Sequence, residues 1–191
     1  NLLESEDDAR LVSGDNTLNN YVWYSGKLWR IVVLNDDGSV KLVTQDNITT
    51  ISMNKEALFE GSWAYQWLNE DFKDTLYNYK NLLVVDYLWN ASFGTASGTS
   101  NKPEEGAMVK GTVGLLNYYE YYKASSSKGY LALGYEWWTM SSSYDKSVLI
   151  PAGGGFRREY PWLAYGIRPS VVLKQGIKIT KGSGSEKNPY T

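Results

Sequence analysis

The chain has 191 residues, with 21 acidic and 19 basic side chains and a formal net charge of −2. This length suits one well-buried domain, and the near-neutral charge argues against nucleic acid or anionic lipid as partners. Cysteine and histidine are both absent, which excludes a disulfide scaffold, a thiol nucleophile, a cysteine-rich zinc site and the commonest general base. The sequence therefore predicts no metal and no cofactor, and it weakens the expectation of an enzyme.

Aromatic residues make up 15% of the chain, with 16 Tyr and 8 Trp against 4 Phe. Tyr and Trp rings present an apolar face and a polar tip, so this excess suits a contact surface. The alternative is that many of these rings fill the core. No apolar run is long enough to cross a membrane, so we expect no membrane insertion by this segment.

The first residues are acidic and weakly patterned, so we expect a leader over residues 1–19, partly helical at most, and a single domain over residues 20–191. The first residue is Asn, which favours a mature form whose export signal has been removed. The runs "YVWY", "LWRIVVL" and "VKLVTQ" are separated by "SGK" and "NDDGS". Because both connections are turn signals with Gly, they predict an antiparallel three-stranded meander over residues 21–45.

The middle of the chain predicts two helices. Ser62 is placed to cap an amphipathic helix over residues 62–79, and "NLLVVDYLW" then predicts a buried strand. Residues 92–111 form a long polar loop, after which Thr112 is placed to cap "VGLLNYYEYYK". This second helix carries too many tyrosines for one buried stripe, so its rings and the loop are a secondary candidate surface.

The last third returns to strands, in "YEWWTMSSS", "KSVLIPAG", "YGIRPSVVLK" and "IKIT". Between them lies "GGGFRREYPWLAYG", which combines glycines, arginines and aromatic rings. The order strands, helix, helix, strands predicts an α+β fold in which the early and late strands meet.

Several of these segments together resemble a known group of domains: "YVWYSGKLWRIVVLNDDGSVKLVTQDNIT", "QWLNEDF", "VGLLNYYEYY", "YEWWTMSSS" and "YGIRPSVVLK". In this order they resemble a domain of unknown function in surface and pilin-like proteins of gut Firmicutes, and "KITKGSGSEKNPY" is similar to the tail of that group. More distantly, the layout resembles the C-type-lectin-like fold of formylglycine-generating enzymes and of the variable proteins of diversity-generating retroelements. The resemblance implies antiparallel sheets with two helices, an extracellular or cell-surface location, and ligand-binding residues on the late strands and loops.

Two departures limit what the resemblance implies. Formylglycine-generating enzymes use copper-binding cysteines, and this chain has none. The Glu-Pro-Asn or Gln-Pro-Asp triplet and the Trp-Asn-Asp signature of calcium-dependent C-type lectins are also absent. The scaffold is therefore implied, but neither activity is. The surface that varies among retroelement proteins corresponds to about residues 135–165 here.

That stretch holds the candidate ligand-binding residues, which are rigid rings and charged side chains beside Ser and Gly, as in a paratope. They are Tyr135, Trp137, Trp138, Tyr144, Asp145, Phe156, Arg157, Arg158, Glu159, Tyr160 and Trp162. Arg157 and Arg158 offer forked donors for carboxylates or sulfated groups. Strand alternation turns one of Trp137 and Trp138 inward, and Arg158 with Glu159 has the alternative reading of an ordinary surface pair.

These residues predict a non-enzymatic extracellular ligand-binding or adhesion domain for a protein or glycan on another cell or surface. One alternative is a pilin-like or surface-layer subunit whose aromatic patch is a subunit interface. The other is a carboxylate-based carbohydrate-active enzyme, which needs two acids about 5 to 9 Å apart. No spacing selects such a pair from the acids available, which include Asp86, Glu120, Glu136, Asp145 and Glu159.

The segment "GIRP" is predicted to be structural rather than catalytic. Pro169 cannot donate to a ladder, so it indicates an edge, a bulge or the start of a strand within residues 166–174. Arg168 is then expected to pin a neighbouring loop through carbonyls or a carboxylate.

Overall fold

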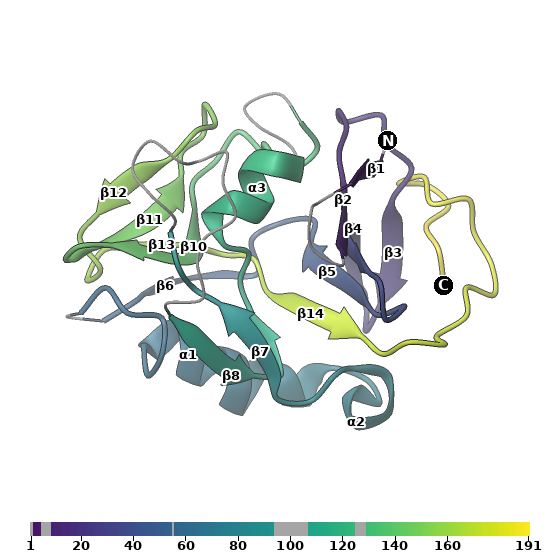
Figure 1. Ribbon diagram of the computed structural model, residues 1–191, viewed down its shortest axis with the longest axis horizontal. Helices are drawn as coiled ribbons and strands as arrows, with labels where there is room; N and C mark the ends of the chain where they lie inside the picture. Colours follow the sequence, from purple (N-terminus) through teal and green to yellow (C-terminus); the bar gives the residue numbers. More distant parts are fainter. Residues whose placement is uncertain (1, 5–8, 55, 94–106, 125–128) are drawn as a thin grey trace.

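The computed structural model describes residues 2–4, 9–54, 56–93, 107–124 and 129–191. Mixed, mostly antiparallel sheets with a few short helices make up an α+β fold (Figure 1). The first sheet has seven strands in the order β1-β2-β4-β5-β14-β9, with β3 also paired to β4. The second sheet has five strands in the order β12-β11-β10-β13-β6, and β7 and β8 form a separate pair.

The bounds of the elements are as follows. The first sheet contains β1 (Leu2–Glu4), β2 (Ala9–Val12), β3 (Tyr21–Tyr24), β4 (Lys27–Asn35), β5 (Val40–Thr44), β9 (Val113–Gly114) and β14 (Ser170–Leu173). The second contains β6 (Thr49–Ser52), β10 (Trp137–Ser143), β11 (Lys146–Ile150), β12 (Arg157–Glu159) and β13 (Ala164–Ile167), and the separate pair is β7 (Tyr87–Asn90) with β8 (Met108–Gly111). The helical segments are α1 (Trp63–Gln66), η1 (Trp67–Phe72), η2 (Lys73–Thr75), α2 (Tyr79–Leu82) and α3 (Tyr118–Ala124).

The predicted meander is confirmed, because β3, β4 and β5 pair antiparallel in chain order. The expectation that residues 1–19 form a leader, partly helical at most, is wrong over β1 and β2, which are strands of the first sheet. Strand β2 pairs antiparallel with the end of β4 and buries Leu11 and Val12. Two adjacent apolar residues are too short a run to give a strand period, so only the partner strand reveals this element.

The first predicted helix is confirmed over residues 63–75. Ser62 caps it, since its Oγ accepts a hydrogen bond from the backbone N–H of Tyr65 at 3.0 Å. The helical path ends earlier than expected because Leu76 has an extended backbone. The strand predicted from "NLLVVDYLW" forms only over β7, since Tyr79–Leu82 form the short helix α2.

The second helix begins later than predicted, at Tyr118 instead of after Thr112. Val113–Gly114 pairs with β14 instead, so Thr112 is not its cap. The cap is Asn117, whose Oδ1 accepts from the N–H of Glu120 at 2.8 Å while Glu120 Oε2 accepts from the N–H of Asn117 at 3.0 Å. This reciprocal pair is a capping box, and it satisfies two backbone donors at the helix start.

The chain passes from the second sheet to the first at Arg168 and Pro169. These residues separate β13 from β14, so the single strand expected over residues 166–174 is divided between two sheets. Pro169 lies where no ladder N–H is required. The strand predicted for "IKIT" is absent, because residues 177–180 are irregular. The tail instead returns along β3, where the N–H of Trp23 donates to the carbonyl of Tyr190 at 2.8 Å.

Helix α3 lies between the two large sheets (Figure 1), where Tyr121 packs in one core cluster with Val33 of β4 and Val148 of β11. A second cluster joins Trp29 and Val171 of the first sheet to Trp138 of the second and Leu68 of η1. Both faces of strand β10 are therefore covered. Among the described residues, no helix is long and apolar enough to cross a membrane.

Candidate functional site

The exposed candidates lie at the outer edge of the second sheet, on the β10–β11 hairpin and beside the edge strand β12. Ser143 pairs with Lys146 across the hairpin, and Val148 pairs with Arg158 of β12. Residues directly opposite one another share a face of a sheet, and so do residues two apart along a strand. Val148 packs in the same core cluster as Tyr121 of α3. Ser143, Lys146 and Arg158 therefore lie on the face of the second sheet that packs against α3, which we call the α3 face.

Tyr160 and Trp162, which follow β12, form a stacked pair with ring centres 4.4 Å apart and planes inclined by 20°. Their exposed fractions are 46% and 57%. The Nζ of Lys146 lies 2.8 Å from the centre of the Tyr160 ring and 5.9 Å from that of Trp162, so the ammonium is outside the stack. Lys146 therefore covers the face of Tyr160 that Trp162 leaves free, and the ring surface that the stack offers to solvent is mainly that of Trp162.

Arg158 completes this group of side chains. Its Nε donates to Ser143 Oγ at 3.0 Å, and its guanidinium lies 5.3 Å from the ring centre of Phe156 and 5.4 Å from that of Phe93. Neither Arg158 nor Lys146 forms an ion pair with any residue that the structure describes. We call Tyr144, Lys146, Arg158, Tyr160 and Trp162 the late-strand surface.

Arg157 lies on the opposite face and is already neutralised. Its guanidinium pairs with Glu136 at 2.8 Å and with Glu159 at 2.9 Å. The hydrogen bond to Glu136 raises the pKa of Arg157 above its ordinary value, and burial only partly opposes this. The pair anticipated for Arg158 and Glu159 is therefore made by Arg157, since alternation turns Arg158 away from Glu159.

Tyr144 occupies the two-residue turn of the hairpin with Asp145, and 93% of its side chain is exposed. Its φ of 58° lies in the left-handed region, which is unfavourable for a bulky side chain. Nothing in the core requires Tyr at this position. An exposed ring held on a strained turn is a feature that accompanies binding sites.

Trp137 is not part of the surface, and its prediction as a ligand-binding residue is corrected. Only 1% of it is exposed, and its ring packs against Tyr121 at 5.7 Å between ring centres. Trp138 is also buried, with its Nε1 donating to the carbonyl of Ile51 at 3.0 Å. Alternation exposes neither indole because core clusters cover both faces of β10.

Tyr135 and Phe156 make their contacts with residues other than Tyr160 and Trp162. The hydroxyl of Tyr135 donates to Asp46 Oδ1 at 2.6 Å, and burial together with this hydrogen bond raises the pKa of Tyr135 to about 12. Phe156 packs edge-on against Tyr118 and Phe93, with ring centres 4.9 and 5.1 Å away. The loop of the secondary candidate surface lies outside the described residues over 94–106.

Arg168 is fully buried at the point where the chain passes from β13 of the second sheet to β14 of the first. Its Nε donates to the carbonyl of Thr44 at 3.0 Å and its Nη1 to the carbonyl of Leu131 at 3.1 Å. The guanidinium also lies 4.7 Å from the centre of the Trp137 ring. Burial lowers the pKa of Arg168 to about 10. These contacts tie the end of β5 to the segment before β10.

No family model, curated protein or solved structure matches this chain. The structure brings Tyr144, Arg158, Tyr160 and Trp162 together with Lys146, which the sequence analysis did not select. Lys146 could have been found from the hairpin register, because it follows the turn at Tyr144 and Asp145.

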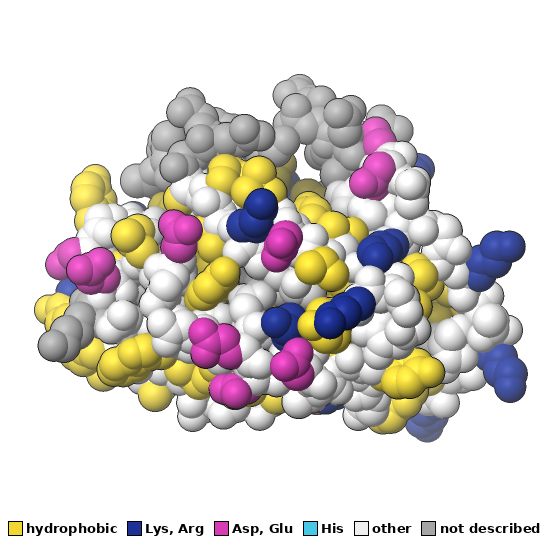
Figure 2. All heavy atoms as spheres, turned by 90° about the horizontal axis from the view of Figure 1, so that it is seen from below, with side chains coloured by type: hydrophobic (Ala, Val, Ile, Leu, Met, Phe, Trp, Pro, Cys, Tyr) yellow, Lys and Arg dark blue, Asp and Glu magenta, His cyan; other side chains and the backbone are white. Residues whose placement is uncertain are grey.

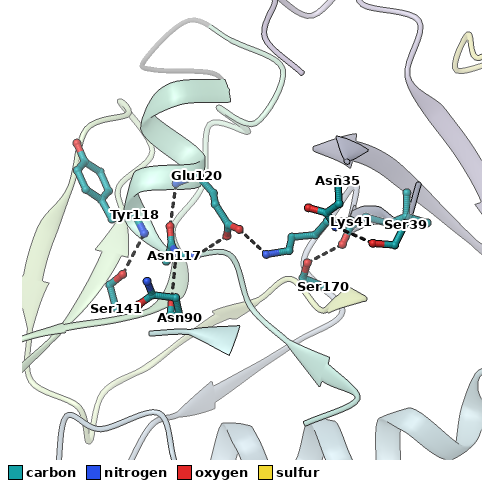
Figure 3. A network of polar contacts seen from close by, with 10 residues as sticks. Asn35, Ser39, Lys41, Asn90, Asn117, Tyr118, Glu120, Ser141 and Ser170 are labelled. Carbon is teal, nitrogen blue, oxygen red and sulfur yellow. Dashed lines mark hydrogen bonds and ion pairs between the residues drawn. The ribbon is translucent and has the colours of Figure 1, made fainter. Parts of the chain in front are cut away.

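A buried polar network was also missed by the sequence analysis (Figure 3). Lys41 of β5 extends toward α3, where its Nζ contacts Glu120 Oε1 and lies 4.9 Å from the centre of the Trp89 ring. Burial alone would lower the pKa of Lys41, but the charges of Glu120 and Tyr87 outweigh it and the net shift is upward. The carboxylate is committed to an ion pair and a helix cap, so this network has a structural role.

Among the described residues, no group of three or more Asp, Glu, His or Cys side chains is placed to hold a metal ion. Figure 2, viewed from the side on which α1 lies, shows both acidic and basic side chains on that face, with hydrophobic side chains among them.

Proposed function

We propose that this chain is a non-enzymatic ligand-binding or adhesion domain that acts outside the cell or at its surface. The observation that carries the proposal is the exposed Tyr160–Trp162 stack, with Lys146 against Tyr160 and Arg158 on the same face of the sheet. Neither cation has a carboxylate partner among the described residues. Rigid aromatic side chains lose little conformational entropy when they bind, so they provide contact area at low cost. The late-strand surface is the part of the chain that meets the ligand.

The scaffold that we propose is C-type-lectin-like. In its support, a sheet built from the late strands carries a short hairpin and an irregular connection at one edge, while helical segments pack on its inner faces. The resemblance of the strand and helix motifs to surface proteins of gut Firmicutes supports the proposed location. Arg168 and the buried pair of Lys41 with Glu120 hold this framework rigid behind the surface.

The test is binding to an array of glycans and host-surface proteins. The double variant Tyr160→Ala/Trp162→Ala removes the stack, and Trp23→Ala is the control because Trp23 is 50% exposed but lies on β3 of the first sheet. Loss of a central aromatic contact costs about 2 kcal/mol or more, so we expect binding to weaken at least roughly 30-fold in the double variant only.

Two results would contradict the proposal. One is an array on which the native chain binds nothing, and the other is binding that survives the double variant. If the native chain assembles into polymers and the double variant abolishes them, the surface is a subunit interface. Turnover of a polysaccharide that disappears on removing one carboxylate would identify a carbohydrate-active enzyme.

A further inference from the structure

The two arginines of β12 differ in how their charges are balanced, although they are adjacent in sequence. Arg157 contacts Glu136 and Glu159, so its positive charge is compensated on one face of the sheet. On the other face, Arg158 and Lys146 have no ion-pair partner among the residues that the structure describes. The α3 face of this edge therefore has positive charge available for an anion, although the whole chain is slightly negative.

From this arrangement we infer that the late-strand surface binds an acidic glycan, a chain whose sugar rings carry carboxylate or sulfate groups. The inference deepens the proposed function and depends on it. The terminal nitrogens of Arg158 and the Lys146 ammonium supply the donors for the acid groups, and the Tyr160–Trp162 stack receives the ring. Because Lys146 covers one face of Tyr160, the exposed ring of Trp162 is the part of the stack that receives the sugar.

The orientation of Arg158 supports this role. Its Nε donates to Ser143, and its guanidinium lies near the rings of Phe93 and Phe156, so these contacts restrict the position of the side chain. The terminal Nη1 and Nη2 have no hydrogen-bond partner among the described residues, so they can bind a carboxylate or sulfate through two parallel hydrogen bonds. A guanidinium held in place in the free protein loses less entropy on binding.

The stack selects a sugar ring over a flexible acidic chain. The C–H face of a pyranose is flat and slightly positive, and the π-face of an aromatic ring is negative, so the two attract one another. An acidic peptide would satisfy the cations, but each residue that it orders costs additional conformational entropy. A rigid ring that carries an acid group meets both requirements with few atoms to immobilise.

Asp145, which adjoins the late-strand surface in the hairpin turn, provides a test of the charge sign of the ligand. It lies in the hairpin turn between Tyr144 and Lys146, so its carboxylate opposes an anionic ligand and favours a cationic one. Its replacement by Asn removes the charge and preserves the shape. Binding of an acidic glycan is therefore expected to strengthen about 2- to 3-fold in Asp145→Asn, on the scale of an exposed charge pair.

The experiment measures dissociation constants for acidic glycans, each beside a neutral counterpart with the same backbone. The pairs are chondroitin sulfate and its desulfated, carboxyl-reduced form, polygalacturonate and its methyl ester, and sialyllactose and its methyl ester. At least one acidic member should bind 10-fold or more tightly than its counterpart. Lys146→Met and Arg158→Gln should each weaken it about 10-fold, while Lys178→Met, a remote exposed lysine, should not.

The other possible results show whether the acidic-glycan assignment fails alone or together with the proposed function. Equal binding of acidic and neutral members, or unchanged binding in the Lys146→Met/Arg158→Gln double variant, overturns the acidic-glycan assignment but leaves a ligand-binding surface. Tight binding of polyglutamate with no acidic glycan bound also overturns it, in favour of an acidic protein. If no glycan, peptide or array protein binds, the inference and the proposed function fail together.

Discussion

Lys41 and Glu120 form a buried ion pair between β5 and α3, although 79 positions separate them in the sequence. The pair joins the first sheet to the helix that packs against both large sheets. Its ammonium also lies near the rings of Tyr87 and Trp89, so little water can compensate the charge if the carboxylate is lost.

Replacing Glu120 by Gln is therefore expected to lower the free energy of unfolding by about 3 kcal/mol or more, because it leaves a buried ammonium without its counter-charge. Urea denaturation measures this value. The double variant Lys41→Met/Glu120→Gln should lose less stability than the two single variants added together, since it removes both charges. Additive losses would show that the two side chains do not interact.

The contribution of Arg168 to stability is expected to depend on the forked shape of its guanidinium group as well as on its charge. Arg168→Lys retains a cation but cannot donate to Thr44 and Leu131 in the same geometry, so it should cost about 2 to 4 kcal/mol of stability. Arg158→Lys is the matched control on the surface, and its effect should stay within about 0.5 kcal/mol. If urea denaturation shows equal losses of stability for Arg168→Lys and Arg158→Lys, the hydrogen bonds of Arg168 do not stabilise the connection between the two sheets.

Alkaline pH should destabilise the protein partly through Tyr118. Burial raises the pKa of Tyr118 to about 12, with smaller contributions from Tyr121 and Tyr122. An unfolded tyrosine ionises near pH 10. The folded pKa is the higher one, so the stabilisation is complete below pH 10 and is lost as the pH rises toward 12. Urea denaturation across this range should show a shallower decline for Tyr118→Phe, and parallel declines would contradict the assignment.

Tyr144 is expected to lower the stability of the protein and to contribute to ligand binding. Tyr144→Gly removes the side chain from a left-handed conformation, so it should raise the melting temperature by a few degrees, equivalent to about 1 kcal/mol. The same change should weaken ligand binding because an exposed ring is lost. A melting temperature that does not rise would show that the turn is unstrained.

The parts of the fold that the sequence predicts are those with local signals. The meander of β3, β4 and β5 has glycine turns between β-rich runs, and the first helix has Ser62 and a regular apolar spacing. The later helix start depends on Asn117 and Glu120, a capping box that is also visible in the sequence as Asn-x-x-Glu. Strand β2 depends on a long-range partner, so no local pattern identifies it.

The candidate surface was predictable in composition but not in arrangement. Exposed rings at Tyr144, Tyr160 and Trp162 lie in the stretch that the sequence selects. Which of Arg157 and Arg158 is neutralised depends on the strand register and on Glu136, which belongs to another segment. The burial of Trp137 likewise depends on α3, which covers a face that alternation alone would leave open.

The most direct test of the central claim is a side-chain NMR titration of the indole N–H signals of the eight tryptophans. Trp162→Phe assigns its own signal, and Trp23 and Trp63, each 50% exposed elsewhere, serve as internal controls. When the acidic glycan that binds best is added, the Trp162 signal should shift and saturate while those of Trp23 and Trp63 stay in place. A saturating shift at Trp23 or Trp63, with Trp162 unmoved, would contradict a ligand site on the late-strand surface.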